Sequence, residues 1–370
     1  MDSFDEWRRR LADAMERRGD WPARAPWVRE AVGAVPRDRF VPERVWRWDG
    51  YTYVPVDRAV DPERWAAEVY GDPDAAVVTQ VTYGLPSSSL SCEAVVVDML
   101  DSLLLEPGHR VLELGTGTGR NAALLACRAG AGRVTSVEVD AELAACARIQ
   151  LREAGADVRV EVADGCDVAP GAVPYDRVMA TFAVDEVPWS WVARTRPGGR
   201  IVTPWGRLGH VALTVAEDGL SATGWMQGLA QFMPARGTGR GRRVSYQQVR
   251  AAAAGPVDTR PAVRQLEPLR DDIHLRFALR VALPEVQITT AEDGDGLNAW
   301  LHDGSSWAAL SAMAHQGGPR RLADELDAAW DRWLGDGSPS LYDYGMTVEP
   351  HRQYVWCVDP VTGPRWPLPV

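Results

Sequence analysis

The sequence contains few cysteines, no lysine and no long apolar segment. Its five cysteines are scattered, no C-x-x-C pair occurs and the six histidines are dispersed, so we expect neither a disulfide framework nor a metal site. All 40 lysine-or-arginine positions are arginine, which we attribute to genome composition. No run approaches the roughly 20 apolar residues of a membrane span, and the charged amino-terminal stretch has no signal core. We therefore expect a soluble, cytoplasmic protein with no membrane contact.

A surplus of positive charge is also lacking. The 40 basic residues face 51 acidic ones, which leaves a net charge of -11. Sequence-independent binding of nucleic acids needs a basic surface that neutralises phosphates, so we expect no nucleic-acid partner. With 370 residues, 46% of them hydrophobic, the chain is long enough for two or three domains with sizeable cores.

The most informative stretch is Val111–Ala126, which reads VLELGTGTGRNAALLA. A short apolar run, closely spaced glycines and an alanine- and leucine-rich segment predict a strand, a tight turn and a helix. Glycines let the backbone approach a ligand, and the helix start offers unpaired N–H groups. This pattern is typical of a nucleotide-binding loop. On glycine spacing alone, Gly117, Gly119 and Ala122 also fit a dinucleotide loop.

Three acidic residues that follow successive predicted strands favour one cofactor. Glu113 precedes the first glycine, where a carboxylate would repel a pyrophosphate but attract a cationic amino acid and a sulfonium. Glu138 is placed to accept from ribose hydroxyls, and Asp164 to meet an adenine edge. Although acids can also simply cap helices, the set favours S-adenosylmethionine. The predicted cofactor-binding residues are Glu113, Gly115, Thr116, Gly117, Gly119, Asn121, Glu138, Val139, Asp164, Gly165 and Thr181.

Strands and helices alternate from Val111 onwards. The predicted strands are VLEL, RVTSVEV, VRVEV, YDRVMATFAV and GGRIVTPWG, with helices over 122–129 and 141–154. Repeated units of this kind predict an α/β domain with a parallel sheet that binds ligands at the carboxyl ends of its strands. HVALTV and LSATGW then predict a closing hairpin.

The flanking segments divide the rest of the chain. We expect residues 1–75 to form an amino-terminal cap, with a helix over 4–15 followed by an irregular arm, and residues 76–235 to form the cofactor-binding domain. Ala235–Arg243, ARGTGRGRR, is interpreted as a mobile loop, with contact to an acidic peptide as the alternative. Residues 244–370 predict an α+β unit for substrate recognition. In it RFALRVAL is expected to be a strand, 322–333 a helix, and YGMTVEP and QYVWCVDP paired strands.

A cluster of serines marks the predicted acceptor side. Ser87, Ser88, Ser89 and Ser91 directly precede a helical run, and serine is a preferred helix cap, so capping stays open for any one of them. Capping needs one hydroxyl, whereas four on a loop flanked by glycine and proline offer a donor-rich surface for an anionic or peptidic substrate. The predicted catalytic residues are Ser91, Ser89 and Ser88.

Residues from about Pro36 to Gly206 resemble the protein L-isoaspartyl/aspartyl O-methyltransferases. The matching motifs, in order, are PRDRFVP, the serine segment leading into VVVDML, VLELGTGTGRNAALLA, SVEVD, ADG, YDRVMATFAVDEVP and RPGGRIVTPWG. The resemblance implies a Rossmann-like class I methyltransferase sheet and places Ser91 on the family's active-site serine, with Ser89 on its preceding hydroxyl residue. Where the family usually carries proline, this chain has Glu93, a departure that argues against ordinary damage repair.

The extension after residue 220 resembles family members associated with ribosomally made, modified peptides, including lanthipeptides and graspetides. The residues concerned are FMPARG, SSWAAL, GGPRRLADELDAAWDRWL and YGMTVEP. The resemblance implies that an aspartate of a modified precursor peptide is esterified and that the ester collapses to an aspartimide. The main alternative is an isoaspartyl repair methyltransferase; a small-molecule methyltransferase and a non-catalytic, cofactor-binding scaffold also stay open. Because an aspartate is already anionic at neutral pH, no strong general base is needed.

Overall fold

The computed structural model describes residues 4–167, 173–206, 208–236, 244–294 and 296–368. They form two compact units. The first comprises the described residues up to Arg236 together with Thr347–Gln353, and the second comprises those between Gly237 and Met346 and from Tyr354 onwards. Residues 1–75 and 76–235, expected as two domains, therefore pack in one unit. The predicted loop at 237–243 lies outside the described residues.

The amino-terminal part is more regular than the sequence predicted. Its elements are α1 (Asp5–Arg18), α2 (Trp27–Ala34), the 3-10 helix η1 (Arg37–Arg39), β1 (Arg44–Trp48), β2 (Tyr53–Asp57), α3 (Pro62–Tyr70), β3 (Val77–Thr82) and β4 (Leu85–Leu90). The expected helix over 4–15 is confirmed, with Leu11 and Met15 buried. The expected irregular arm is wrong, because β1 and β2 join a sheet of order β2-β1-β3-β4. Its proline, Pro55, is accommodated because β2 is an edge strand.

The serine segment is a strand rather than a loop, which corrects the prediction. Ser87, Ser88 and Ser89 lie in β4, which pairs antiparallel with β3. The turn between the two strands uses Tyr83 and Gly84, both at positive φ. Serine is a weak strand former, so the pairing with β3 decided the conformation. Helix α4 (Glu93–Ser102) begins only after Cys92, which caps it without a side-chain hydrogen bond, so none of the four serines is the helix cap.

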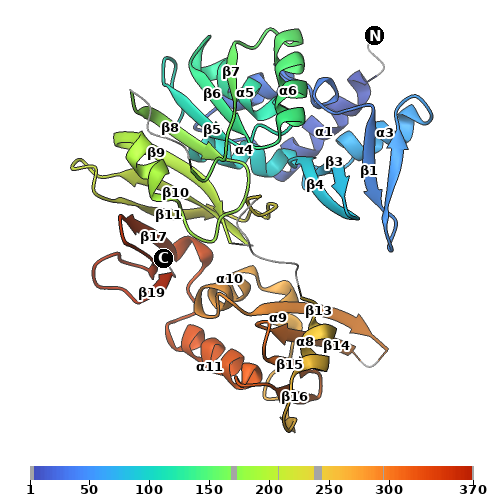
Figure 1. Ribbon diagram of the computed structural model, residues 1–370, viewed down its shortest axis with the longest axis vertical. Helices are drawn as coiled ribbons and strands as arrows, with labels where there is room; N and C mark the ends of the chain where they lie inside the picture. Colours follow the sequence, from blue (N-terminus) through green and yellow to red (C-terminus); the bar gives the residue numbers. More distant parts are fainter. Residues whose placement is uncertain (1–3, 168–172, 207, 237–243, 295, 369–370) are drawn as a thin grey trace. The chain divides into compact units, whose positions relative to one another are not determined.

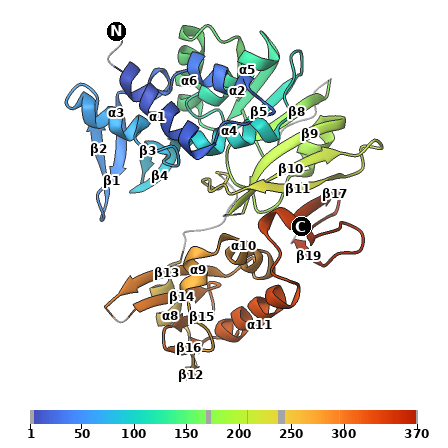
Figure 2. The same ribbon diagram turned by 180° about the vertical axis from the view of Figure 1, so that it is seen from behind.

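The α/β domain has the predicted architecture. Its elements are β5 (Val111–Leu114), α5 (Arg120–Ala129), β6 (Val134–Glu138), α6 (Ala141–Glu153), β7 (Val158–Val162), β8 (Tyr175–Ala180), α7 (Trp189–Arg194), β9 (Thr195–Trp205), β10 (Gly209–Val215) and β11 (Ala222–Gly228). The sheet order through these strands is β11-β10-β9-β8-β5-β6-β7. The strands from β9 to β7 run parallel, and β9, β10 and β11 are antiparallel, as the closing hairpin predicted. Figures 1 and 2 show α5 and α6 beside β5–β7, and α3 beside the β1–β2 hairpin.

One hydrophobic core joins the amino-terminal elements to this sheet. Met15, Phe40 and Trp65 are buried in the same cluster as Leu100 of α4 and Leu124 of α5. Burial of such side chains stabilises the fold by about 1.5–3 kcal/mol each. The amino-terminal cap therefore shares its hydrophobic core with the cofactor-binding domain.

A hairpin near the end of the chain belongs in part to the first unit. β17 (Tyr344–Glu349) and β18 (Arg352–Cys357) are neighbours, as predicted for YGMTVEP and QYVWCVDP, and β17 lies next to β11. The Oγ1 atoms of Thr347 and Thr223 are 3.1 Å apart. These strands were expected in the carboxyl-terminal unit, but Thr347–Gln353, which spans the end of β17, the turn and the start of β18, belongs to the first.

The second unit is of mixed α and β character. It contains α8 (Tyr246–Ala252), β12 (Asp258–Pro261), α9 (Glu267–Asp271), α10 (Ile273–Ala282), β13 (Gln287–Asp293), β14 (Gly296–His302), β15 (Trp307–Leu310), β16 (Met313–Gly317), α11 (Leu322–Gly335), the 3-10 helix η2 (Leu341–Asp343) and β19 (Arg365–Leu368). The strands β12 to β16 form a five-stranded antiparallel sheet of order β12-β16-β15-β14-β13. The helix expected over 322–333 is confirmed as α11.

The strand predicted for RFALRVAL is wrong, because this segment is helix α10. The buried residues Phe277, Leu279 and Val281 alternate along the sequence, which mimics a strand. The Asp272 side chain accepts from the backbone N–H groups of His274 and Leu275 and so starts a helix there. Short apolar runs do not distinguish the two structures by period alone.

Candidate active site

The carboxyl ends of four parallel strands bring the predicted cofactor residues to one edge of the sheet. β5 lies between β6 and β8, so the chain order reverses at β5, and ligands of such sheets bind where this reversal opens a crevice. Gly115 follows β5, Glu138 ends β6, Asp164 follows β7 and Thr181 follows β8. The strand order thus brings these residues to one edge, and their role in binding the cofactor stays a prediction.

The glycine loop approaches its surroundings too closely for larger residues. Gly115, Gly117 and Gly119 all have positive φ, at 93°, 52° and 86°, a region that side chains disfavour. A Cβ at Gly115 would lie 2.5 Å from Oγ1 of Thr181, and one at Gly119 would lie 3.2 Å from Cγ of Leu151. The loop therefore offers backbone without side chains at its three glycines and leads into the first turn of α5.

Glu113, in the strand directly before this loop, is held by two hydrogen bonds. Its side chain is fully buried; Asn121 Nδ2 donates to Oε1 at 2.8 Å, and the Ser136 hydroxyl donates to Oε2. Burial raises the pKa of Glu113 to about 7, against the opposing effect of the Ser136 and Asn121 hydrogen bonds. A cation nearby would favour the ionised form. A direct contact of Glu113 with the cofactor stays a prediction, since both of its oxygens already accept hydrogen bonds from Asn121 of α5 and Ser136 of β6.

Glu138 joins the second strand to the glycine loop. The Gly117 backbone N–H donates to its Oε2 at 2.9 Å, and the Asp140 N–H donates to its Oε1 at 3.1 Å. Each carboxylate oxygen can accept more than one hydrogen bond, so capacity is left for the predicted ribose hydroxyls. The next residue, Val139, is 46% exposed, which leaves its side chain at the rim.

The predicted adenine side is held by helix α7. Asp164 is exposed, and its Oδ1 accepts from the Cys166 N–H at 2.8 Å. The carbonyl of Gly165 accepts from Trp191 Nε1 at 2.7 Å. Thr181 donates through its hydroxyl to the carbonyls of Gly115 and Leu114, at 2.5 and 3.2 Å. Thr116 is buried, with its Oγ1 2.6 Å from the Ser136 hydroxyl.

This arrangement fits S-adenosylmethionine. A glycine-rich backbone cradle, a buried acid in the strand before it and an acid at the end of the neighbouring strand match a ligand with a cationic amino-acid part and a ribose. Glu138, Asp164 and the loop residues Gly115, Gly117 and Gly119 would hold it.

The predicted acceptor residues lie beside the glycine loop. A Cβ at Gly117 would be 3.9 Å from the Ser89 carbonyl oxygen, so the end of β4 adjoins the cradle. Ser89 and Ser91 are partly buried, and Ser88 is 5% exposed. In the part of the chain that the structure describes, no hydrogen bond engages the hydroxyls of Ser89 or Ser91. Ser87 differs, because its hydroxyl bonds Gln80 and Thr82 within the hairpin.

Sequence reasoning missed a segment that links the two sides of this edge. Residues 229–236 follow β11, and Ala183 beyond β8 accepts from the N–H of Ala235 at 3.0 Å and donates to the carbonyl of Met233 at 2.8 Å. Arg236 then bonds Asp140 Oδ2 and Gln80 Oε1, at 3.0 and 3.1 Å, and also the Ser87 carbonyl. The sequence assigned Arg236 to a mobile loop. Its partners lie too far away in sequence for a local pattern to reveal them.

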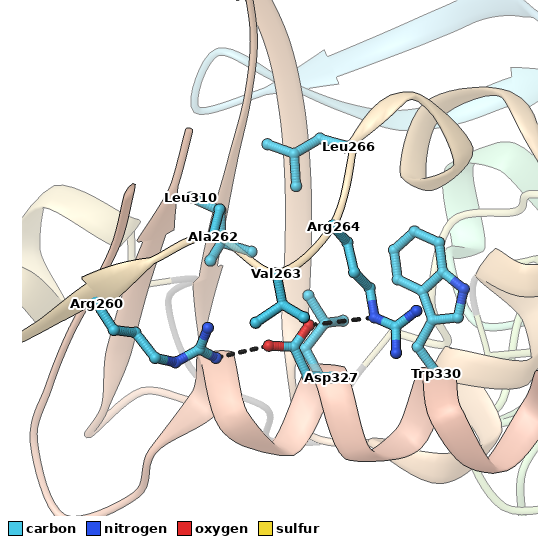
Figure 3. Close-up of a pocket in the computed structure, with 9 residues that line it drawn as sticks. Arg260, Ala262, Val263, Arg264, Leu266, Leu310, Asp327 and Trp330 are labelled. Carbon is cyan, nitrogen blue, oxygen red and sulfur yellow. Dashed lines mark hydrogen bonds and ion pairs between the residues drawn. The ribbon is translucent and has the colours of Figure 1, made fainter. Parts of the chain in front are cut away.

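The described residues outside this edge contain neither a metal-binding cluster nor a membrane-spanning helix. Within the described ranges, no cluster of three or more His, Cys, Asp or Glu side chains could hold a metal ion. No described helix is both long and apolar enough to span a bilayer. A cavity of the second unit (Figure 3) measures only about 10 Å³, room for a single water. Its arginines, Arg260 and Arg264, are paired with Asp327 of α11.

Comparison with known proteins agrees with this geometry. Residues 15–223 match the family described as protein-L-isoaspartate(D-aspartate) O-methyltransferase. The chain is 31% identical over 248 residues to protein-L-isoaspartate O-methyltransferase 2 of Archaeoglobus fulgidus, covering 66% of this chain and 99% of that protein. It is 33% identical over 205 residues to the protein-L-isoaspartate O-methyltransferase of Methanocella arvoryzae, covering 55% of this chain and 95% of that protein.

A solved structure extends the likeness in fold to almost the whole chain. A protein-L-isoaspartate O-methyltransferase of 20% identity superimposes with a TM-score of 0.54, covering 95% of this chain and 100% of that one. The cradle at the end of β5, the acids of the neighbouring strands and these matches lead to one conclusion. The chain belongs to the protein-L-isoaspartate(D-aspartate) O-methyltransferase family, and S-adenosylmethionine is its cofactor.

Proposed function

We propose that this protein esterifies the free carboxylate of isoaspartyl residues in polypeptides. The names of the relatives support this acceptor, and the observation that carries the proposal is the junction of the Ser89–Ser91 segment with the glycine loop. The Ser89 carbonyl lies at the glycine loop, and within the described residues no hydrogen bond engages the hydroxyls of Ser89 and Ser91. The sequence alone favoured an ordinary aspartate, but the comparisons give the isoaspartyl acceptor the stronger support.

The chemistry makes modest demands on the protein. S-adenosylmethionine supplies an electrophilic methyl group on a sulfonium. The acceptor carboxylate is anionic at neutral pH, so the chain's task is to align it and to limit its solvation. In this proposal the Ser91 hydroxyl, helped by Ser89 and Ser88, donates to the carboxylate oxygen that does not attack or to the neighbouring peptide. One hydrogen bond to a charged group contributes about 1.5–3 kcal/mol.

A matched pair of peptides tests the acceptor. Two synthetic hexapeptides of one sequence, with isoaspartate or aspartate at the same position, are assayed for methyl incorporation from labelled cofactor. We expect turnover of the isoaspartyl peptide, and none of its aspartyl twin. Turnover of neither peptide, by protein that binds S-adenosylhomocysteine, would contradict the proposal.

A second acceptor, an aspartate in a ribosomally made and modified precursor peptide, is favoured by one observation. Glu93, where the resembling family usually carries proline, is buried in an ion-pair cluster beside Ser91, so the acceptor segment is built differently here. In this alternative the ester would be attacked by the backbone nitrogen of the next residue, which releases methanol and closes an aspartimide. The folded second unit does not decide between the two acceptors, because the similar solved structure covers 95% of the chain.

The two acceptors differ in the mass of the product. A modified precursor peptide would gain about 14 mass units as a methyl ester. As an aspartimide it would be about 18 mass units lighter than the unmethylated peptide. Methylation of that peptide with no turnover of isoaspartyl hexapeptide would replace the first proposal by the second. A stable ester that never loses methanol would contradict the aspartimide step.

A further inference from the structure

Three charged side chains are buried together behind the acceptor segment. Arg37, Glu93 and Arg120 are 2%, 1% and 1% exposed. Arg37 Nη1 lies 3.1 Å from Glu93 Oε2, and Arg120 Nη1 lies 2.9 Å from Glu93 Oε1. Burial alone would raise the pKa of Glu93, but the two guanidinium groups outweigh it and hold that pKa below its usual value. Glu93 is thus an anion between two cations, and these three residues are called the triad below.

Each member of the triad belongs to a different functional segment. Arg37 starts η1 of the cap, Glu93 is the first residue of α4, two positions after Ser91, and Arg120 is the first residue of α5, directly after Gly119. The remaining donors tie these segments to main chain. Arg37 Nη1 also donates to the Ser91 carbonyl at 3.0 Å, and its Nε donates to the Val69 carbonyl at 2.8 Å. Arg120 Nε donates to the Val35 carbonyl at 3.0 Å.

Stability alone does not account for the triad. A buried ion pair is often no more stabilising than apolar side chains of similar volume, because desolvation offsets the attraction. Within the described part of the chain, the Nη2 atoms of Arg37 and Arg120 are buried without a hydrogen-bond partner, a further cost. Nor does α4 need an acid at its first position, where proline would start the helix equally well. What the triad does supply is a fixed geometry between the glycine loop and Ser91.

We propose that Glu93 is a positioning residue that couples the glycine loop to the acceptor segment, so that the triad holds Ser91 in register with the bound cofactor. The coupling runs from the first turn of α5 through Arg120 and Glu93 to Arg37, and from Arg37 to the Ser91 carbonyl. Asn121, next to Arg120, donates to Glu113 of β5, so the same turn of α5 is also fixed to the strand that precedes the glycine loop. This inference rests on the proposed role of Ser91 in binding the acceptor carboxylate.

The test removes one charge of each sign. Replacing Glu93 alone would leave two buried cations unneutralised, a change that costs about 3–5 kcal/mol and unfolds many domains. The double variant E93Q/R120Q keeps the net buried charge and the size of the side chain at position 93, and shortens the side chain at position 120. Its matched control is E106Q/R128Q, because Arg128 near the other end of α5 pairs with Glu106 at 2.7 Å in a more exposed setting.

Turnover and cofactor affinity are measured separately, with an acceptor that the wild type methylates. We expect E93Q/R120Q to unfold cooperatively and to bind S-adenosylhomocysteine within about threefold of the wild type. Its kcat should fall on the order of 100-fold, the effect of misplacing a reacting group by about 1 Å, while the control keeps its kcat. Adding S91A to E93Q/R120Q should cost little more, because residues acting as a unit are not additive. An unchanged kcat, or a full S91A effect in the double variant, would overturn the inference.

Hydrogen exchange gives a readout that needs no acceptor. In the wild type, S-adenosylhomocysteine should slow amide exchange over 115–121 and also over 89–94; in E93Q/R120Q, protection should be confined to 115–121. If the wild type methylates no carboxylate but shows the spread of protection, the proposed function fails and the coupling stands. If S-adenosylhomocysteine slows amide exchange only over 115–121 in the wild type, the proposed coupling is wrong, whatever the acceptor is.

Discussion

Gln353, at the start of β18, makes two hydrogen bonds with the main chain of Val187. The Val187 N–H donates to Oε1 of Gln353 at 2.8 Å, and Nε2 of Gln353 donates to the Val187 carbonyl at 3.1 Å. Val187 is fully buried, and Gln353 is 8% exposed. The segment around Val187 leads into α7, whose Trp191 bonds Gly165 of the predicted adenine side. Gln353 therefore fixes the segment that leads to the predicted adenine side.

Replacing Gln353 with alanine should destabilise the first unit. The substitution leaves the buried N–H and carbonyl of Val187 unpaired, and each such group costs about 1–3 kcal/mol. We expect the free energy of unfolding to fall by about 2–4 kcal/mol in a urea titration. The control is Q227A, because the partly buried Gln227 bonds the carbonyl of Trp225, only two residues away. Equal effects of the two substitutions would show that the Val187 contact contributes nothing.

Glu113 should make the stability of the ligand-free protein fall as the pH rises. Its pKa is raised by burial to about 7 from an ordinary value of 4.5, so between these pH values the folded state binds more protons than the unfolded state. By linkage, stability then decreases with pH over this interval and levels off above it. The isosteric E113Q cannot ionise and avoids a cost on the order of 3 kcal/mol at pH 8.

Urea unfolding at pH 5 and pH 8 checks this sign. E113Q should gain stability over the wild type at pH 8 and lose that advantage near pH 5, while the exposed control E153Q follows the wild type at both. An E113Q variant that is less stable than the wild type at pH 8 would mean that the ionised carboxylate is favoured by its hydrogen bonds after all.

The parts of the fold that the sequence predicted are those with a local physical signal. From β5 to β11, apolar runs, glycines and turn residues repeat within short windows, and the strand ends bring Glu138 and Thr181 to the loop as expected. The amino-terminal sheet was missed because β1 and β2 are short and carry a proline and polar residues. α10 was missed because its buried residues alternate as in a strand.

The parts that no local pattern could predict are contacts between distant residues. Gln353 and Val187 are 166 positions apart, and Arg37 and Glu93 are 56 apart. The resemblance flagged Glu93 as unusual but gave no partner for it. Two buried arginines from separate segments supply the explanation, and only the tertiary structure brings them together.

Gly115 should tolerate no side chain, for a reason that goes beyond its backbone angle. Its φ is 93°, and an added Cβ would meet Thr181 Oγ1 at 2.5 Å, where two hydrogen bonds hold that hydroxyl. Gly108 is a matched control with φ 84° and no atom within 4 Å of an added Cβ. G108A should cost only the backbone strain of about 1–2 kcal/mol and bind S-adenosylhomocysteine normally. Calorimetry should find no binding of S-adenosylhomocysteine to G115A. Equal affinities of G115A and G108A would show that the glycine loop is not part of the cofactor site.

Ser91 should affect turnover and leave cofactor affinity unchanged. Its hydroxyl has no hydrogen-bond partner in the described residues, while its carbonyl is held by Arg37, so S91A removes a donor without breaking an internal bond. Loss of one hydrogen bond to an anionic acceptor, about 1.5–3 kcal/mol, corresponds to a fall in kcat/KM of roughly 10- to 150-fold.

Ser87 is the matched control for this substitution, because it lies in the same serine segment but its hydroxyl is hydrogen-bonded to Gln80 and Thr82. S87A should lower hairpin stability slightly and leave kcat/KM within about twofold. Affinity for S-adenosylhomocysteine, measured by calorimetry, should be the same in S91A and the wild type. Weakened cofactor binding with unchanged turnover would instead assign Ser91 to the cofactor site, and the acceptor would then have to be sought along Ser89 and Ser88.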